Sequence, residues 1–159
     1  MGRMASAAIL IAIVFPAIAR TGNAIAADRT GVSEQSSEEI RLVNALSELD
    51  ASGSWLDTDS DSLFDVWVWV KNTGAETVRS VNEMDVFVHG GGTSARIPHS
   101  SVAGGSNPQW AHAVEGGGTW LVDITLKITI HYATAVAADD YAIEVATPRG
   151  ANATGTFPF

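Results

Sequence analysis

The chain has 159 residues, a formal net charge of −9 at pH 7 and no cysteine. This length accommodates one modest domain plus a further segment, and the acidic balance argues against nucleic acid as a partner because its phosphates would be repelled. The lack of cysteine excludes disulfides, thiolate metal sites and cysteine nucleophiles, so the hydrophobic core must hold the domain together.

The first predicted element is an apolar helix close to the N-terminus. An uncharged run extends from Arg3 to Arg20, and a helix over residues 4–27 would be about 36 Å long, enough to cross a bilayer. The same residues also fit a cleaved secretory signal peptide, with small-x-small sites at 17–19 and 24–26. The residues alone leave both possibilities open.

This N-terminus resembles that of type IV pilin-like proteins. A short basic leader, residues 1–3, directly precedes the apolar helix, and Pro16 lies within the helix. In that family the leader is removed and the helix is kept as a membrane anchor or assembly stalk. The resemblance therefore implies leader processing at Arg3 and Met4, and a pilin-like membrane helix over 4–27.

An amphipathic stalk helix is predicted over residues 28–53. Ser36 and Glu39 have the spacing of a capping box, and Gly53 is a helix-ending residue. Apolar side chains recur every third position, which places them on one helix face: Ile40, Val43, Leu46 and Leu49.

From residue 54 the apolar period changes to alternation, which is typical of strands with one buried face. The predicted strands cover 63–70, 84–89, 120–132 and 141–147. The C-terminal residues predict a short edge strand, because Pro158 is tolerated only at an edge. We therefore expect a mainly β fold, with an antiparallel immunoglobulin-like β-sandwich head over 54–159.

Within the strand at 63–70, two tryptophans alternate with valines. Trp67 and Trp69 point away from the face of Val66 and Val68. Two outward tryptophans form an apolar patch that is either covered, with the stalk helix as the favoured cover, or contacts a partner.

Few residues suggest chemistry. Asp57, Asp59 and Asp61 alternate as in a calcium loop, but Ser62 and Val68 stand where such a loop needs glycine and a bidentate glutamate, so a polar turn is the preferred interpretation. The histidines are scattered without ligand spacing. No catalytic motif is found and no cofactor is expected. Asn152 begins a glycosylation sequon.

The stretch VWVWVKNTGAETVRSVNEMDVFVHGG, residues 66–91, resembles accessory proteins of the archaeal flagellum (the archaellum), above all the FlaF type and less closely the FlaG type. Asn72 and Gly74 supply its turn. The resemblance implies a non-catalytic, single-pass membrane protein with an extracytoplasmic head, which links the motor to the cell envelope by binding the surface layer. Trp67, Trp69, Asn72 and Gly74 are the expected partner-binding residues.

Two alternatives stay open. One is an archaellin- or pilin-like filament subunit, although Arg20, Asp28 and Arg29 would then place charges near a filament core, where unpaired charge is costly. The other is a soluble secreted β-sandwich that binds a ligand after ordinary leader cleavage. A homo-oligomer is compatible with any of these functions.

Overall fold

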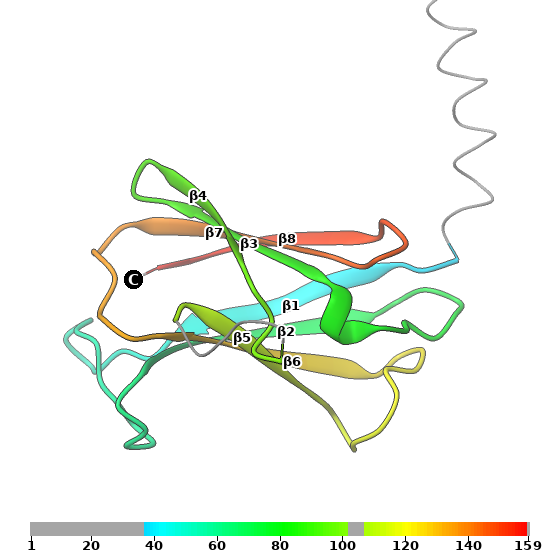
Figure 1. The fold of residues 1–159 in the computed structure, drawn as a ribbon, viewed down its shortest axis with the longest axis horizontal. Coiled ribbons are helices and arrows are strands. Elements are labelled where there is room, and N and C mark those ends of the chain that lie inside the picture. The colour runs from blue at the N-terminus through cyan, green and yellow to red at the C-terminus, as the bar shows by residue number, and fades with distance from the viewer. Residues whose placement is uncertain (1–36, 102–106, 159) are drawn as a thin grey trace, which may run out of the picture. The chain divides into compact units, whose positions relative to one another are not determined.

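A computed structural model describes residues 37–101 and 107–158 (Figure 1). They form a sandwich of two antiparallel four-stranded sheets. In the first sheet the order is β1 (Ile40–Ser47), β2 (Phe64–Asn72), β6 (Thr125–Tyr132) and β5 (Gln109–Val114). In the second it is β4 (Thr93–Ile97), β3 (Asp85–Gly90), β7 (Asp140–Ala146) and β8 (Asn152–Pro158). A short 3-10 turn, Val81–Glu83, precedes β3.

Several predicted strands are confirmed. β2, β3 and β7 occupy the ranges expected from alternation, and the C-terminal strand β8 lies at a sheet edge, where Pro158 is tolerated. The prediction of a mainly β, antiparallel sandwich is therefore correct for the described residues. None of these residues forms a helix long and apolar enough to cross a membrane. The leader and the helix predicted over residues 4–27 lie outside the described range.

The core lies between the two sheets and follows the alternation of the strands. Val66, Val68 and Val70 of β2 are fully buried, as are Ile128 and Ile130 of β6. Trp110 and Trp120 are the largest fully buried side chains. Because buried apolar area is the main stabilising term in folding, these rows supply most of the stability that a chain without disulfides needs.

The predicted stalk helix is wrong for residues 40–47, which form β1. This strand pairs with β2 over its whole length and places Ile40 and Ala45 in the core. A bulge between Leu42 and Asn44 inserts one extra residue, which turns Val43 outward. The apolar residues that recur every third position therefore do not share one helix face. Some of them point into the core and others point outward from the strand.

The strand predicted over 120–132 begins only at Thr125. Trp120 forms an isolated bridge with Val78, and Asp123 has a positive φ of 65°, which interrupts the strand before β6. Residues 54–56 do not pair with β2; Trp55 instead forms an isolated bridge with Leu49.

Two strands lie where the sequence suggested no strand. β4 and β5 both lie between the predicted strands at 84–89 and 120–132, in a stretch for which no strand is predicted. β5 completes the first sheet by pairing with β6, from Gln109 opposite His131 to Val114 opposite Leu126.

The turn after β2 fastens the start of the described chain to the sandwich. Asn72 is fully buried; its side-chain amide donates to the carbonyl of Glu76 and its side-chain oxygen accepts from the amide of Gly74. The amides of Thr73 and Gly74 both donate to the carbonyl of Glu39, each at 2.9 Å. The turn that carries the sequence resemblance is therefore an internal structural junction.

Gly74→Ala should destabilise the head, because an added Cβ would lie 2.5 Å from the amide nitrogen of Glu39 and 2.6 Å from the carbonyl oxygen of Ser37. These are backbone atoms, which cannot rotate away as a side chain can, so we expect a cost of about 1–3 kcal/mol in the free energy of unfolding. Denaturant melts measure it, with the exposed neighbour Thr73→Ala as control. An unchanged midpoint for Gly74→Ala would show that the turn is not packed in this way.

Candidate partner-binding face

The outer surface of the first sheet carries both outward tryptophans. Trp67 and Trp69 of β2 lie opposite Thr129 and Lys127 of β6. On their other side they lie opposite Leu46 and Asn44 of β1. Since directly paired residues share a sheet face, all six side chains belong to one surface. We call the apolar part of this surface, with Lys127, the tryptophan face: Val43, Leu46, Trp67, Trp69 and Lys127.

The cover that we expected from a stalk helix is not found among the described residues, since the segment in question forms β1 beside β2 and does not lie over it. Both tryptophans are half-buried, whereas Val43 is 58% exposed and Leu46 is 46% exposed. Large exposed apolar side chains next to tryptophans form the kind of patch that marks contact sites.

A groove of about 580 Å³ runs across this surface next to Trp69. Its walls come from β1, β2, β5 and β6: Val43, Asn44, Trp69, Ala113, Val114, Glu115, Thr125 and Lys127. The groove exists because β5 presents the small side chains of Ala111 and Ala113 opposite Thr129 and Lys127, so nothing on that strand fills the space beside the tryptophan.

Lys127 is the charged centre of the face. Its ammonium nitrogen lies 5.1 Å from the ring centroid of Trp67 and 5.8 Å from that of Trp69. Both distances are within the range of a cation–π contact. The face therefore combines apolar area with one positive charge held in place by two aromatic rings.

The four residues that we expected to bind a partner separate into two groups. Trp67 and Trp69 lie on the open face, whereas Asn72 is fully buried and Gly74 contacts the backbone of residues 37–39. Their role in binding stays a prediction for all four. Arg3 and Met4 lie outside the described residues, and Asn152, the sequon residue, is exposed at the start of β8.

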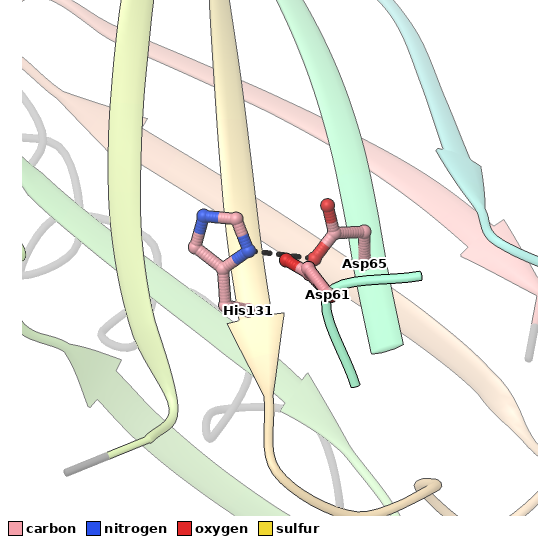
Figure 2. Close-up of side chains that lie close together, drawn as sticks. All are labelled: Asp61, Asp65 and His131. Carbon is pink, nitrogen blue, oxygen red and sulfur yellow. Dashed lines mark hydrogen bonds and ion pairs between the residues drawn. The ribbon is translucent and has the colours of Figure 1, made fainter. Parts of the chain in front are cut away.

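A second cluster joins the loop before β2 to the ends of β2 and β6, where Asp61, Asp65 and His131 approach one another (Figure 2). Nδ1 of His131 donates to Oδ1 of Asp65 at 2.7 Å. Asp65 is only 3% exposed, and this burial raises the pKa of its carboxyl, against the opposing effect of the bond from His131. The ligand atoms of the three residues lie within 4.8 Å of one another, so their geometry fits a cation.

The carboxylates of this loop also bind its backbone. Glu48 accepts from the hydroxyl of Thr58 and from the amide of Asp65, and Asp57 accepts from the amides of Asp61 and Ser62. Glu48, Asp57 and Asp59 form a second group of possible ligands. Because several of these oxygens satisfy loop amides, a structural turn explains the arrangement without a metal.

Calcium should not bind this loop tightly. Val68, at the position of the bidentate glutamate of a calcium loop, is fully buried in the core and offers no oxygen. Calorimetric titration of the full chain should show no binding tighter than about millimolar. Micromolar affinity that Asp59→Asn abolishes would contradict this prediction.

The sequence pattern did not reveal a contact between two histidines. Nε2 of His99 lies 3.1 Å from Nδ1 of His112, and both rings contact the buried ring of Trp110. Burial lowers the pKa of both imidazoles. The two histidines are 13 residues apart in the sequence. Their contact can therefore be recognised only when the position of β5 in the first sheet is known.

Sequence comparisons and structural comparisons gave different results. No protein-family model matches the chain, and no curated protein matches it. Among solved structures, the archaellum periplasmic stator protein FlaG from Sulfolobus acidocaldarius is 18% identical, with a TM-score of 0.56 over 76% of this chain and 99% of that one. The chain has the fold of an archaellum stator protein. The resemblance seen in residues 66–91 is thus confirmed at the level of the fold.

Two further structures share this fold. A chain of the stator protein complex FlaF and FlaG from the same organism is 19% identical, with a TM-score of 0.54 over 75% of this chain and 88% of that one. An archaeal flagellin from Methanocaldococcus jannaschii is 10% identical, with a TM-score of 0.55 over 76% of this chain and 89% of that one. Stator proteins and a filament protein therefore share the sandwich, so the fold alone does not distinguish these two functions.

Proposed function

We propose that the protein is a non-catalytic structural component of the archaellum that links the motor to the cell envelope. The observation that carries this proposal is the structural likeness to the stator protein FlaG, which covers nearly all of that chain. In this role the head holds a fixed partner and transmits force.

The tryptophan face suits this role. It offers exposed Val43 and Leu46 beside two half-buried tryptophans on a rigid sheet, and such clusters are frequent interface anchors. The inner side chains of the same strands are fully buried, so the sheet holds the outer side chains in fixed positions. A rigid contact surface of this kind suits the transmission of force to a partner. The envelope partner, a surface-layer protein in the proposal, would contact this face.

Anchoring belongs to the same proposal. Residues 4–27 would form a single membrane-spanning helix after removal of the leader at Arg3 and Met4, with the head on the extracytoplasmic side. The head could also pair with another archaellum subunit, in the way that FlaF and FlaG of Sulfolobus acidocaldarius form a complex with each other.

The second candidate function is a filament subunit, favoured by the flagellin that shares the fold. In a filament the N-terminal helices pack together in a core. Arg20, Asp28 and Arg29 would then bring charges close to that core, where they need partners. A single anchored protein avoids this cost, which is why we place the stator role first.

A deletion strain tests the proposal. Loss of a link between motor and envelope should leave filaments on the cells but abolish swimming, because torque is no longer transmitted. Electron microscopy and motility assays measure the two outcomes, and a plasmid copy of the gene should restore swimming. Cells that swim normally without the protein would rule the proposal out.

A further inference from the structure

The ammonium of Lys127 has no carboxylate within ion-pair distance in the described part of the chain. Lys71, Arg96 and Arg149 each contact a carboxylate, whereas Arg41 and Arg79, like Lys127, have none at ion-pair distance among the described residues. In a chain of net charge −9, carboxylates are abundant, yet the interactions that the ammonium of Lys127 makes with the described residues are cation–π contacts to Trp67 and Trp69. The position of Lys127 therefore leaves its charge available to another molecule.

Three basic side chains lie on two adjacent rows of this face, Arg41, Lys71 and Lys127, although the chain as a whole is acidic. Arg41 of β1 lies opposite Lys71 of β2 on the same sheet face, one row away from Lys127. Lys71 is paired with Asp123 at 3.0 Å, and Glu115 lies at the margin of the groove. Arg41 and Lys127 thus remain as two cations without a carboxylate at ion-pair distance among the described residues, which favours an acidic group of the partner at this place.

We propose that the groove beside Trp69 binds a protein segment in which a carboxylate side chain is flanked by apolar residues. The carboxylate contacts the ammonium of Lys127, and the apolar neighbours cover Val43, Leu46 and the tryptophans. Ala113 leaves room for the segment because its side chain is a single methyl group. This inference rests on the proposed function, since the segment belongs to the envelope partner.

Charge also disfavours a second copy of the chain as the occupant. In a two-fold symmetric pair the same face meets itself, so the pair would bring together the Lys127 and Arg41 side chains of both copies, with Glu115 at each groove margin as the carboxylate that the groove itself supplies. An apolar ligand without charge would leave the ammonium buried and unpaired, which costs free energy. A segment with a carboxylate removes both difficulties.

Variants of Lys127 test the inference in living cells. Lys127→Met keeps the aliphatic stem over the tryptophans but removes the charge, so it should abolish swimming while filaments remain. Lys127→Glu should do the same, whereas Lys127→Arg keeps the charge and the aromatic contact and should swim. Lys71→Met, on the same face but paired with Asp123, is the control and should swim.

The comparison with the tryptophans separates the two proposals. Suppose that Lys127→Met swims normally while the Trp67→Ser, Trp69→Ser double variant does not swim. This result would overturn the inferred contact between a partner carboxylate and Lys127, and it would leave the proposed function intact. Normal swimming of both variants would overturn the inference and remove the tryptophan face from the mechanism, whereas the proposed function itself is tested by the deletion strain.

A crosslink identifies the occupant directly and does not depend on motility. A photoreactive benzoylphenylalanine at Glu115, an exposed position at the margin of the groove, is activated in intact cells that carry the full chain, and the crosslinked peptide is sequenced by mass spectrometry. The inference predicts a peptide of another protein with Asp or Glu next to apolar residues. A peptide of this chain, a lipid or a segment without a carboxylate would overturn it.

Discussion

Replacing both Trp67 and Trp69 with serine should abolish swimming while the cells keep their filaments and the protein stays folded. The valines next to the tryptophans remain in the core, because Val66 and Val68 point to the opposite face and are fully buried. The tryptophans themselves are only half-buried in the isolated chain, so their loss removes contact area mainly from the bound state.

The expected size of this effect follows from what tryptophan anchors contribute. Truncating an interface anchor costs about 2 kcal/mol or more, so two such losses weaken binding roughly a thousandfold. Motility assays and electron microscopy of the same cells give the result, and thermal melts confirm that the head is folded.

Phe87→Ser is the matched control. Phe87 is also a half-buried aromatic residue on an outer face, but it lies on β3 of the second sheet and stacks on His89. This variant should swim. Normal swimming of the tryptophan variant, or equal loss of swimming in both variants, would remove the tryptophan face from the mechanism.

Ile128→Ala should be among the most destabilising single substitutions in the head. Ile128 is fully buried and lies between Val68 of β2 and His112 of β5 in the middle of the first sheet. Truncation leaves a cavity that the surrounding strands cannot close, so we expect a loss of about 2–5 kcal/mol in the free energy of unfolding.

Denaturant melts of the full chain measure this loss. Thr129→Ala, the next residue of β6, is the control, because its side chain lies on the outer face opposite Trp67. The control should change stability by less than about 0.5 kcal/mol. If Thr129→Ala cost more than Ile128→Ala, the assignment of inner and outer faces of β6 would be wrong.

Local pattern was sufficient to find the central strands. In β2, the alternation of Val66, Val68 and Val70 with two tryptophans predicted both the strand and its inner face, and the structure confirms both. The outward position of the tryptophans, which is the basis of the candidate face, was therefore visible in the sequence.

The alternation of apolar and polar residues failed to predict a strand where one extra residue shifts the register, and where the two faces of a strand differ little in hydrophobicity. The bulge in β1 between Leu42 and Asn44 converts a strand into an apparent three-residue period. β5 is a sheet edge in which His112 alternates with small alanines, so it shows little difference between faces. Without knowing which strands pair, the residue pattern of β1 cannot be told from that of a helix, and the pattern of β5 cannot be told from that of a loop.

Contacts between distant residues could not be predicted at all. Lys127 reaches Trp69 only because β6 pairs with β2 in one register, and Asp65 meets His131 for the same reason. Topology and register decide such contacts, and the local sequence carries no trace of them. The alternation of β6 indicates that the side chain of Lys127 points outward, away from the isoleucine row, but not which residues it contacts.

The location of the protein in swimming cells tests the central claim most directly. Electron microscopy with a gold-labelled antibody against the head shows where the chain lies relative to the filament. A structural link between motor and envelope predicts label at the cell-side base of each archaellum and none along its length. Label distributed along the whole filament, or protein recovered only from the medium, would contradict the account.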